Sequence, residues 1–359
     1  MSSVNARPPA TEIAAIAIAA VAVVAFGVQV ALPASSRLTN GFSAYYTAAR
    51  LVVQGADPAR FYDDAWFSSQ TIRLGFGAAQ DIYNVNPPAT ALLLLPLAGF
   101  DPVTAKEFWT ALNLVFLGVA LMILARLGGW SPVICSAAVI LVTAFQPVQE
   151  EIKLGQAYAL LLVLEALLAR AYLNRRNGFV GGVLAVLLGF KAAGLTLPAL
   201  LIAQRQWRAL VATAITLLAI VGLTIPILGW LAWSTYTRLL FDFGGHPEIA
   251  VTAYQSVPSV LFHLFRYDPV WNTAPLVDLP LAAAILVILV EIALVAITFA
   301  ITARPALRSR SDCSVSFAAW AILSIIGSPA SADYHYTLLL VPIALLAGHW
   351  YEFDRRPLY

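Results

Sequence analysis

The chain has 359 residues and a formal net charge of +2; 60% of its residues are hydrophobic and only 11% are charged. An ordinary soluble domain has about 25% charged residues, and a soluble fold of this length cannot bury so much apolar surface. The composition therefore excludes a cytosolic enzyme, a nucleic-acid-binding protein, a disordered chain and a disulfide scaffold. It predicts an all-α fold, that of a polytopic helical membrane protein.

Ten apolar stretches are expected to be membrane segments. They cover residues 12–32, 104–126, 131–147, 156–173, 178–190, 192–204, 208–230, 277–302, 314–329 and 336–351. A full crossing needs about 20 apolar residues, so we expect segments 178–190 and 192–204 to be two short helices that meet near Lys191. The stretch 87–100 is also short and begins with two prolines, which favours an interfacial or re-entrant helix over a crossing.

Basic residues indicate the orientation of the chain. If the amino terminus is cytoplasmic, twelve of the 21 Lys and Arg residues fall in short cytoplasmic loops and the rest in longer external segments, as the positive-inside rule predicts. Both termini are then cytoplasmic. We expect one membrane domain over 1–359, with two large external pieces at 33–103 and 231–276, and chemistry on the external face.

The first external piece contains many aromatic and acidic residues. Apolar residues recur at helical spacing over 42–53, which predicts an amphipathic helix at the membrane interface. Four acids precede the double proline: Asp57, Asp63, Asp64 and Asp81. Asp57 suits a turn, and Asp63 or Asp64 suits the cap of a helix that begins near Ala65. Asp63 and Asp64 are also candidates for a general base, which must face an acceptor hydroxyl.

Lys191 stands in the middle of an apolar stretch that runs from Leu184 to Ala203. Ionisable residues inside membrane segments are costly and mark functional sites. At an external turn between two short helices, the Lys191 ammonium is expected to meet a phosphate or pyrophosphate headgroup. The alternative is a side chain that extends to the interface without a ligand.

The second external piece and the last external turn add further polar candidates. Gln255 precedes a short amphipathic helix that ends at Arg266, which suits either a phosphate contact or a helix end. His335 lies in a turn with an acid and two tyrosines, where it suits a hydrogen bond to a sugar or a phosphate, or a purely structural bond. The histidines show no metal-ligand spacing, and no metal site is predicted.

The order of these motifs resembles that of the family 87 glycosyltransferases, membrane enzymes with the GT-C architecture, of which the best-known members are mannosyltransferases. The resemblance covers most of the chain. It rests on the segments 42–50 and 55–58, Asn86-Pro87-Pro88, Gly155-Gln156, 181–191 followed by Pro198 and 205–208, Gln255-Ser256, Ser328-Pro329 and His335-Tyr336.

The resemblance implies inverting transfer of a sugar, mannose or another hexose or pentose, from a polyprenyl-phosphate-sugar donor to a lipid or glycan acceptor. The reaction is expected on the non-cytoplasmic face of a bacterial plasma membrane, without a cofactor. The donor phosphate is expected to meet Lys191, with Arg266 or Arg50, which stabilises the charge that develops as it leaves. The residues expected to contact the substrates are Tyr45, Tyr46, Gln156, Gln255 and His335.

One position departs from the family pattern. Members of the family usually carry an acid immediately before the residue matching Phe42, which looks like the catalytic base, and this sequence has Gly41 there. Two alternatives stay open: a nearby carboxylate, Asp63, Asp64 or Asp57, is the base, or the chain is a non-catalytic member of the family. A third is a transporter or flippase of a lipid-linked substrate, but no internal repeat typical of transporters is seen.

Overall fold

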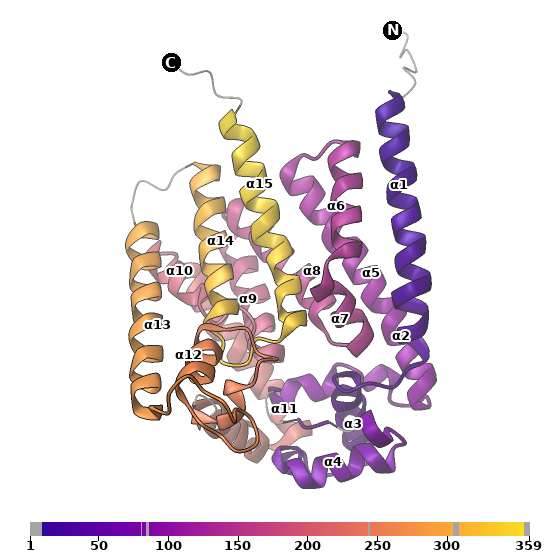
Figure 1. Ribbon diagram of the computed structural model, residues 1–359, viewed down its shortest axis with the longest axis vertical. Helices are drawn as coiled ribbons and strands as arrows, with labels where there is room; N and C mark the ends of the chain where they lie inside the picture. The colour runs from indigo at the N-terminus through magenta and orange to yellow at the C-terminus, as the bar shows by residue number, and fades with distance from the viewer. Residues whose placement is uncertain (1–8, 80, 84–85, 243–244, 304–308, 355–359) are drawn as a thin grey trace.

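The computed structural model describes residues 9–79, 81–83, 86–242, 245–303 and 309–354 (Figure 1). Within these ranges the regular secondary structure is helical, apart from two isolated antiparallel bridges, Tyr254–Ala332 and Asp268–Asn272. The predicted all-α fold is confirmed.

The longer helices form a bundle. They are α1 (Ala10–Phe26), α5 (Pro102–Gly128), α6 (Pro132–Ala144), α8 (Tyr158–Leu173), α9 (Asn177–Lys191), α11 (Trp207–Asp242), α13 (Pro280–Thr302), α14 (Arg310–Ile326) and α15 (Leu340–Asp354). The shorter helices are α2 (Leu32–Ser36), α3 (Phe42–Val53), α4 (Asp64–Arg73), α7 (Gln146–Leu154), α10 (Leu197–Ala203) and α12 (Val257–Phe265). A π-helical turn, Gly27–Ala31, continues α1 into α2.

Four continuous helical segments among the described residues are long and apolar enough to cross a membrane. They are Ala10–Ser36, Pro102–Gly128, Trp207–Asp242 and Pro280–Thr302. The bent pair α6 and α7 makes a fifth if it is one broken span. Each of the ten predicted membrane segments contains a helix. Apart from the four long helices and the bent pair, these helices are shorter than a full crossing. The stretch 87–100 forms two 3₁₀ turns, η4 (Pro88–Leu92) and η5 (Leu95–Leu97).

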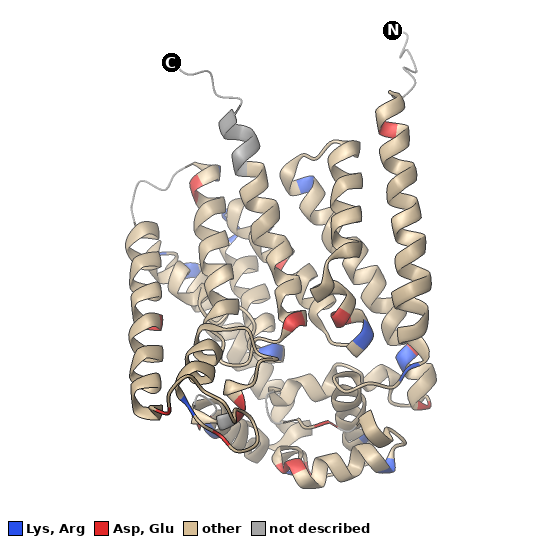
Figure 2. Cartoon of the chain, viewed as in Figure 1, with Lys and Arg blue, Asp and Glu red and all other residues tan. Residues whose placement is uncertain are grey.

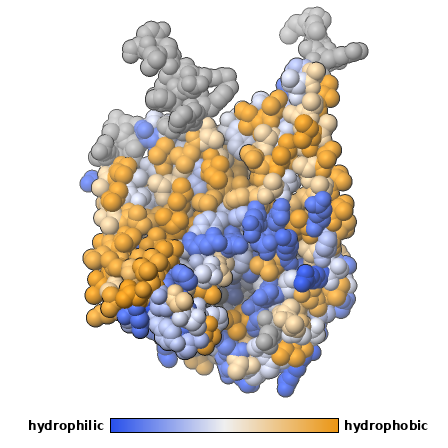
Figure 3. All heavy atoms as spheres, in the orientation of Figure 1, coloured by the Kyte–Doolittle hydropathy of each residue, from blue (hydrophilic) through white to orange (hydrophobic). Residues whose placement is uncertain are grey.

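The flanks of the bundle are apolar and exposed, as a lipid-facing surface must be. In the most apolar window of α13 only 6% of residues are buried, and in that of α11 only 11%. Figure 3 shows hydrophobic side chains over α13 and α1 and a gathering of hydrophilic ones over α7. Figure 2 shows long uncharged stretches in α1 and α6 and a cluster of charged residues at α7. In water such flanks would drive association.

Local signals in the sequence explain where the long helices start, stop and bend. The Asp101 side chain accepts hydrogen bonds from the amides of Val103 and Thr104, both at 3.1 Å, and so caps α5. Inside α11, Pro226 removes an amide donor and Gly229 has non-helical angles (φ 77°, ψ 151°), so the helix kinks there. The α11 helix also packs against η4.

The segment 33–103, which the sequence predicts to be external and which keeps the name first external piece below, is folded onto the bundle and has its own apolar core. Phe42, Tyr45 and Tyr46 of α3 pack with Leu94 and with Trp109 of α5. In Figure 1, α3 and α4 lie below the lower ends of α1, α6 and α15. This core holds the start of α3 against the bundle, next to the connection between α7 and α8.

Candidate functional site

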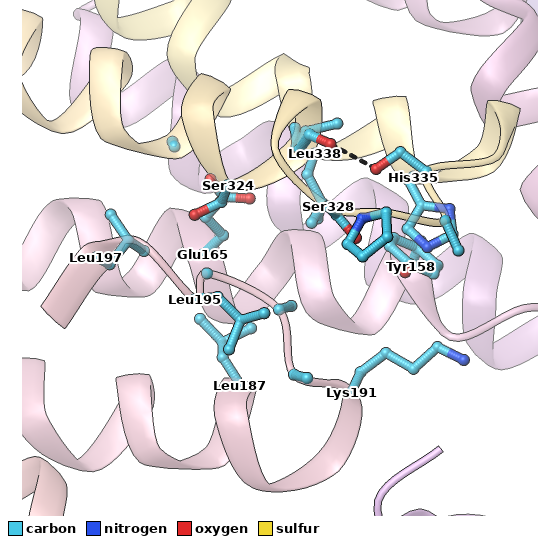
Figure 4. Close-up of a pocket in the computed structure, with 18 of the residues that line it drawn as sticks. Tyr158, Glu165, Leu187, Lys191, Leu195, Leu197, Ser324, Ser328, His335 and Leu338 are labelled. Carbon is cyan, nitrogen blue, oxygen red and sulfur yellow. Dashed lines mark hydrogen bonds between the residues drawn. The ribbon is translucent and has the colours of Figure 1, made fainter. Parts of the chain in front are cut away.

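A cavity of about 180 Å³ opens between α8, the turn after α9, the lower part of α11 and the connection from α14 to α15 (Figure 4). Its polar lining includes Lys191, Glu165, Ser324, Tyr254, Tyr334 and His335. Leucines at 187, 195 and 197 line the same cavity. A cavity that joins a few polar groups to an apolar wall suits a ligand with one charged end and one apolar end.

Lys191 is the last residue of α9. Ala192 takes a left-handed conformation (φ 50°) and turns the chain away, so the lysine side chain stands at the tip of a helix, where the backbone dipole favours a cation. Its ammonium donates a hydrogen bond of 2.6 Å to Oδ1 of Asn86 and lies 5.1 Å from the centre of the Tyr45 ring. Figure 4 shows the side chain extending beneath Tyr158 and His335.

The Lys191 ammonium has an amide where a buried cation usually has a carboxylate. Across the part of the chain that the structure describes, no Asp or Glu oxygen lies within 4.0 Å of it. An anion that enters the cavity would therefore meet a partly buried cation that no carboxylate within 4.0 Å offsets among the described residues.

His335 belongs to an aromatic group on the opposite wall. Its ring centre lies 4.6 Å from that of Tyr158 and 4.6 Å from that of Tyr334. Nδ1 of His335 lies 3.0 Å from the Ala332 amide nitrogen and 3.2 Å from the Ala332 carbonyl oxygen, so the Ala332 backbone holds the ring through this nitrogen. Burial and the charge of Lys191 lower the pKa of His335 to about 3, so the ring is a neutral hydrogen-bond donor at physiological pH.

Gln255 joins the second external piece to the last external turn. The backbone amide of Gln255 donates to the Ser331 carbonyl at 2.7 Å, and the side-chain nitrogen Nε2 donates to Oδ1 of Asp333 at 2.7 Å. The Tyr336 hydroxyl donates to the Gln255 carbonyl. Gln255 is exposed and does not line the cavity, but these bonds hold its neighbour Tyr254 on the cavity wall.

The start of α3 carries the other predicted substrate contacts. The Tyr45 hydroxyl donates to Oε1 of Gln156 at 2.6 Å, and both side chains are buried. The Tyr45 ring lies under the Lys191 ammonium. The Tyr46 hydroxyl instead donates to the Phe100 carbonyl at 2.6 Å, within the core of the first external piece. Tyr45 therefore lies next to the Lys191 ammonium. Tyr46 packs in the apolar core of the first external piece.

A carboxylate that the sequence did not single out meets the start of α3. Oδ2 of Asp81 accepts a hydrogen bond from the Gly41 amide, and Oδ1 accepts one of 2.9 Å from the Ile82 amide. Burial raises the pKa of Asp81, while these hydrogen bonds and the charge of Lys191 oppose the rise. Burial also raises the pKa of Tyr254, and the charge of Asp81 adds to that shift. Asp81 does not line the cavity, but its charge acts on three residues that do, namely Lys191, Tyr254 and Tyr334.

The three predicted catalytic carboxylates lie at the exposed ends of short helices. Oδ1 of Asp57 accepts from the Ala59 amide at 3.0 Å, and Oδ1 of Asp63 accepts from the Trp66 amide at 3.0 Å, where it caps α4. Asp64 is the exposed first residue of α4. None of the three lines the cavity. Asp57 therefore stabilises a turn and Asp63 caps a helix, as the surrounding sequence predicts.

The predicted arginines also lie apart from the cavity lining. Nη1 of Arg266 donates to the Gly245 carbonyl at 3.0 Å, and its guanidinium lies over the Phe262 ring. Nη1 of Arg50 donates to the Ala98 carbonyl in the first external piece. Lys191 is therefore the one member of the predicted cation set that lines the cavity.

Sequence reasoning missed several groups that the fold brings to this place. Asn86 lies 105 positions from Lys191, and no local pattern links the two. Glu165 lines the cavity, is only 5% exposed, and its Oε2 has no hydrogen-bond partner. It interrupts an apolar segment just as Lys191 does, so the same criterion would have found it. No cluster of three metal-ligating side chains occurs among the described residues.

The comparisons with known proteins give one match. The model of glycosyltransferase family 87 matches residues 84–329, which is most of the chain and includes Lys191, Gln255 and Ser328-Pro329. The matched range leaves out α3, Asp81 and His335. No curated protein and no solved structure matches the chain.

Proposed function

Because the chain belongs to glycosyltransferase family 87, we propose that it moves a sugar, mannose or another hexose or pentose, from a polyprenyl-phosphate-sugar donor to a lipid or glycan acceptor. The observation that carries this proposal is the Lys191 ammonium, which faces the cavity with an amide as its partner and no carboxylate within 4.0 Å among the described residues.

The donor phosphate is the anion that fits this cation. In transfer, the bond between the anomeric carbon and the phosphate oxygen breaks, and negative charge grows on the phosphate. A fixed ammonium stabilises that charge more in the transition state than in the ground state. Asn86 holds the ammonium in place without neutralising it, which a carboxylate partner would do.

The remaining lining supports the rest of such a donor. Tyr158, Tyr334 and His335 present ring faces and hydrogen-bond donors to a sugar. The leucines at 187, 195 and 197 present apolar surface to the first isoprene units of a lipid chain. The polar wall, the Lys191 ammonium and the apolar wall would then contact the sugar, the phosphate and the lipid chain, which follow one another in this order in a polyprenyl-phosphate sugar.

We place the site on the non-cytoplasmic face of a bacterial plasma membrane, with ten membrane segments and both termini cytoplasmic. The start of α1 and the end of α15 lie at the same end of the bundle, opposite α3 and α4 (Figure 1). The excess of basic residues in the short loops at the terminal end supports this orientation.

Transfer by the purified full chain in lipid nanodiscs tests the proposal. The donor is undecaprenyl-phosphate mannose with a radiolabelled sugar, and the acceptors are octyl glycosides of mannose, galactose and arabinose. Wild type is expected to form labelled glycolipid, and Lys191→Met to lose this activity by about 100-fold or more. Lys153→Met is the matched control, since Lys153 pairs with Glu150 at 2.9 Å away from the cavity. Equal transfer rates for wild type and Lys191→Met would show that Lys191 does not bind the donor phosphate.

A further inference from the structure

We propose that Asp81 is the general base that takes the proton from the acceptor hydroxyl. The inference rests on the proposed transfer reaction. Its geometrical basis is the carboxylate of Asp81, which two backbone amides hold at the start of α3, the helix whose Tyr45 ring lies 5.1 Å from the Lys191 ammonium.

The orientation of the Asp81 carboxylate is fixed by main-chain donors. Oδ2 accepts from Gly41 and Oδ1 accepts from Ile82. A carboxylate has roughly four acceptor positions. The two amides take two of them and the Ser43 hydroxyl also acts on the Asp81 carboxylate, so one position remains for a substrate hydroxyl. The side chain is only partly buried, which leaves it within reach of an acceptor that enters from the external side.

Gly41 allows this arrangement and brings no carboxylate of its own. Its backbone has a positive φ of 88°, and a Cβ there would stand 2.5 Å from Nε2 of Gln156. Gln156 is itself held by the Tyr45 hydroxyl. A side chain at position 41 is therefore excluded while Gln156 keeps its place, and the acidic group at this point comes from Asp81, forty positions later.

Asp81 and Lys191 are neighbours without being an ion pair, which is what a displacement reaction needs. Their charges act on each other, yet they are not within 4.0 Å. A direct ion pair would neutralise both the base and the phosphate-binding cation. With space between them, the leaving phosphate meets the ammonium on one side of the anomeric carbon, and the acceptor hydroxyl meets the carboxylate on the other.

Other carboxylates near the cavity fit this role less well. Glu165 lies seven residues beyond Tyr158 in α8, about 10 Å further along the helix axis, among Leu187 and Leu197. The Asp333 carboxylate already accepts a hydrogen bond of 2.7 Å from the side chain of Gln255. Glu151 is 1% exposed and accepts the Ala159 amide.

The step is balanced with these groups alone. The acceptor oxygen forms a bond to the anomeric carbon while its proton passes to an oxygen of Asp81. The bond from the anomeric carbon to the phosphate oxygen breaks, and its electron pair stays on the lipid phosphate beside Lys191. The products are an inverted glycoside, a polyprenyl monophosphate and a protonated Asp81, which returns its proton to water. Burial, which raises the pKa of this carboxyl, makes it a better base.

Three variants in nanodiscs test the inference with undecaprenyl-phosphate mannose and the octyl glycosides. Asp81→Asn keeps the shape of the side chain and removes the base, so kcat is expected to fall by about 10²–10⁴-fold. The Kd of undecaprenyl phosphate is expected to stay unchanged, which shows that the fold and the phosphate site are intact. Asp57→Asn and Asp63→Asn are matched controls from the same external piece and are expected to keep wild-type kcat.

A chemical rescue separates a base from a structural residue. Asp81→Ala is expected to be inactive alone and to recover part of its kcat when sodium formate supplies a carboxylate. If wild type transfers mannose and Asp81→Asn does so at the same kcat, the inference about Asp81 is overturned and the proposed function stands. If wild type transfers nothing to any of the octyl glycosides from this donor, the proposed function fails, and the role of Asp81 fails with it.

Discussion

Nε2 of Gln156 occupies the place next to Gly41 that a side chain would need: a Cβ on residue 41 would stand 2.5 Å from it. Residue 41 immediately precedes α3, Gln156 lies in the connection from α7 to α8, and the Tyr45 hydroxyl joins the two segments. This contact fixes the first external piece against the bundle and leaves the Gly41 amide to Asp81.

Gly41→Ala is expected to destabilise the fold and to reduce transfer. The positive φ costs about 1–2 kcal/mol for a residue with a Cβ, and the collision with Gln156 adds about 1–3 kcal/mol of overpacking. Gly55→Ala is the matched control, because Gly55 also has a positive φ (71°) but open space around it. Thermal unfolding of the purified variants measures the difference. Equal melting temperatures would show that Gln156 moves aside freely.

The pH dependence of transfer is expected to report Asp81. A base acts when ionised, so kcat/KM should fall as the pH drops through the pKa of Asp81, which burial places above the ordinary aspartate value of about 3.9. The groups that face it are Lys191, Tyr45, Tyr254 and Tyr334. His335, with a pKa of about 3, should add no inflection near neutrality. A step near pH 6.5 that disappears in His335→Gln would contradict this assignment.

Asn86→Asp is expected to separate stability from donor binding. A carboxylate in place of the amide at 2.6 Å would pair with the Lys191 ammonium and raise the melting temperature. The same pair would compete with the donor phosphate, so the Kd of undecaprenyl phosphate should rise by about tenfold or more. Asn86→Ala, which only removes the hydrogen bond, should raise this Kd less and should not stabilise the protein. Unchanged binding in both variants would argue against a phosphate at Lys191.

Asp63→Ala is expected to affect stability and not catalysis. The Asp63 carboxylate caps α4 through the Trp66 amide, and loss of such a cap costs about 1 kcal/mol. Asp63→Asn should be nearly neutral, since asparagine caps equally well. Transfer per folded molecule should match wild type in both variants. A loss of kcat in Asp63→Asn without a change in melting temperature would restore Asp63 as a candidate base.

The proposed orientation predicts which loops a membrane-impermeant maleimide reaches in intact cells. In a background of Cys135→Ser and Cys313→Ser, Gln54→Cys should react, because it lies at the exposed end of α3 in the first external piece. Asn174→Cys, exposed at the end of α8, should react only after lysis. The reverse pattern would invert the topology and place the cavity opening on the cytoplasmic side.

Composition and local contrast in the sequence were enough to predict the class of fold and the central cation. Lys191 stands out because one charge interrupts an apolar stretch, and this signal needs no knowledge of the tertiary structure. The short helices that meet beside it follow from the same stretch being too short for two crossings. The family match over residues 84–329 agrees with the motif order that suggested it.

The partners of Lys191 could not be predicted in the same way. Arg266 and Arg50 are as basic as Lys191, but tertiary packing turns them onto the carbonyls of Gly245 and Ala98. Among the first-loop acids, Asp57 and Asp63 looked closer to the expected base because they lie nearer to Gly41 in sequence. The chain between residues 41 and 81 instead folds back on itself, so the first-loop carboxylate that contacts Gly41 is that of Asp81.

The amide partner of Lys191 has a consequence for how this protein responds to ligands. Among the described residues no carboxylate lies within 4.0 Å of the Lys191 ammonium, so an anion that binds beside it must stabilise the native state by mass action. At a hundredfold excess over Kd this linkage is worth about 2.7 kcal/mol. A thermal-shift series of polyprenyl phosphates with different chain lengths would therefore rank the lipids by affinity and identify the natural carrier without any knowledge of the acceptor.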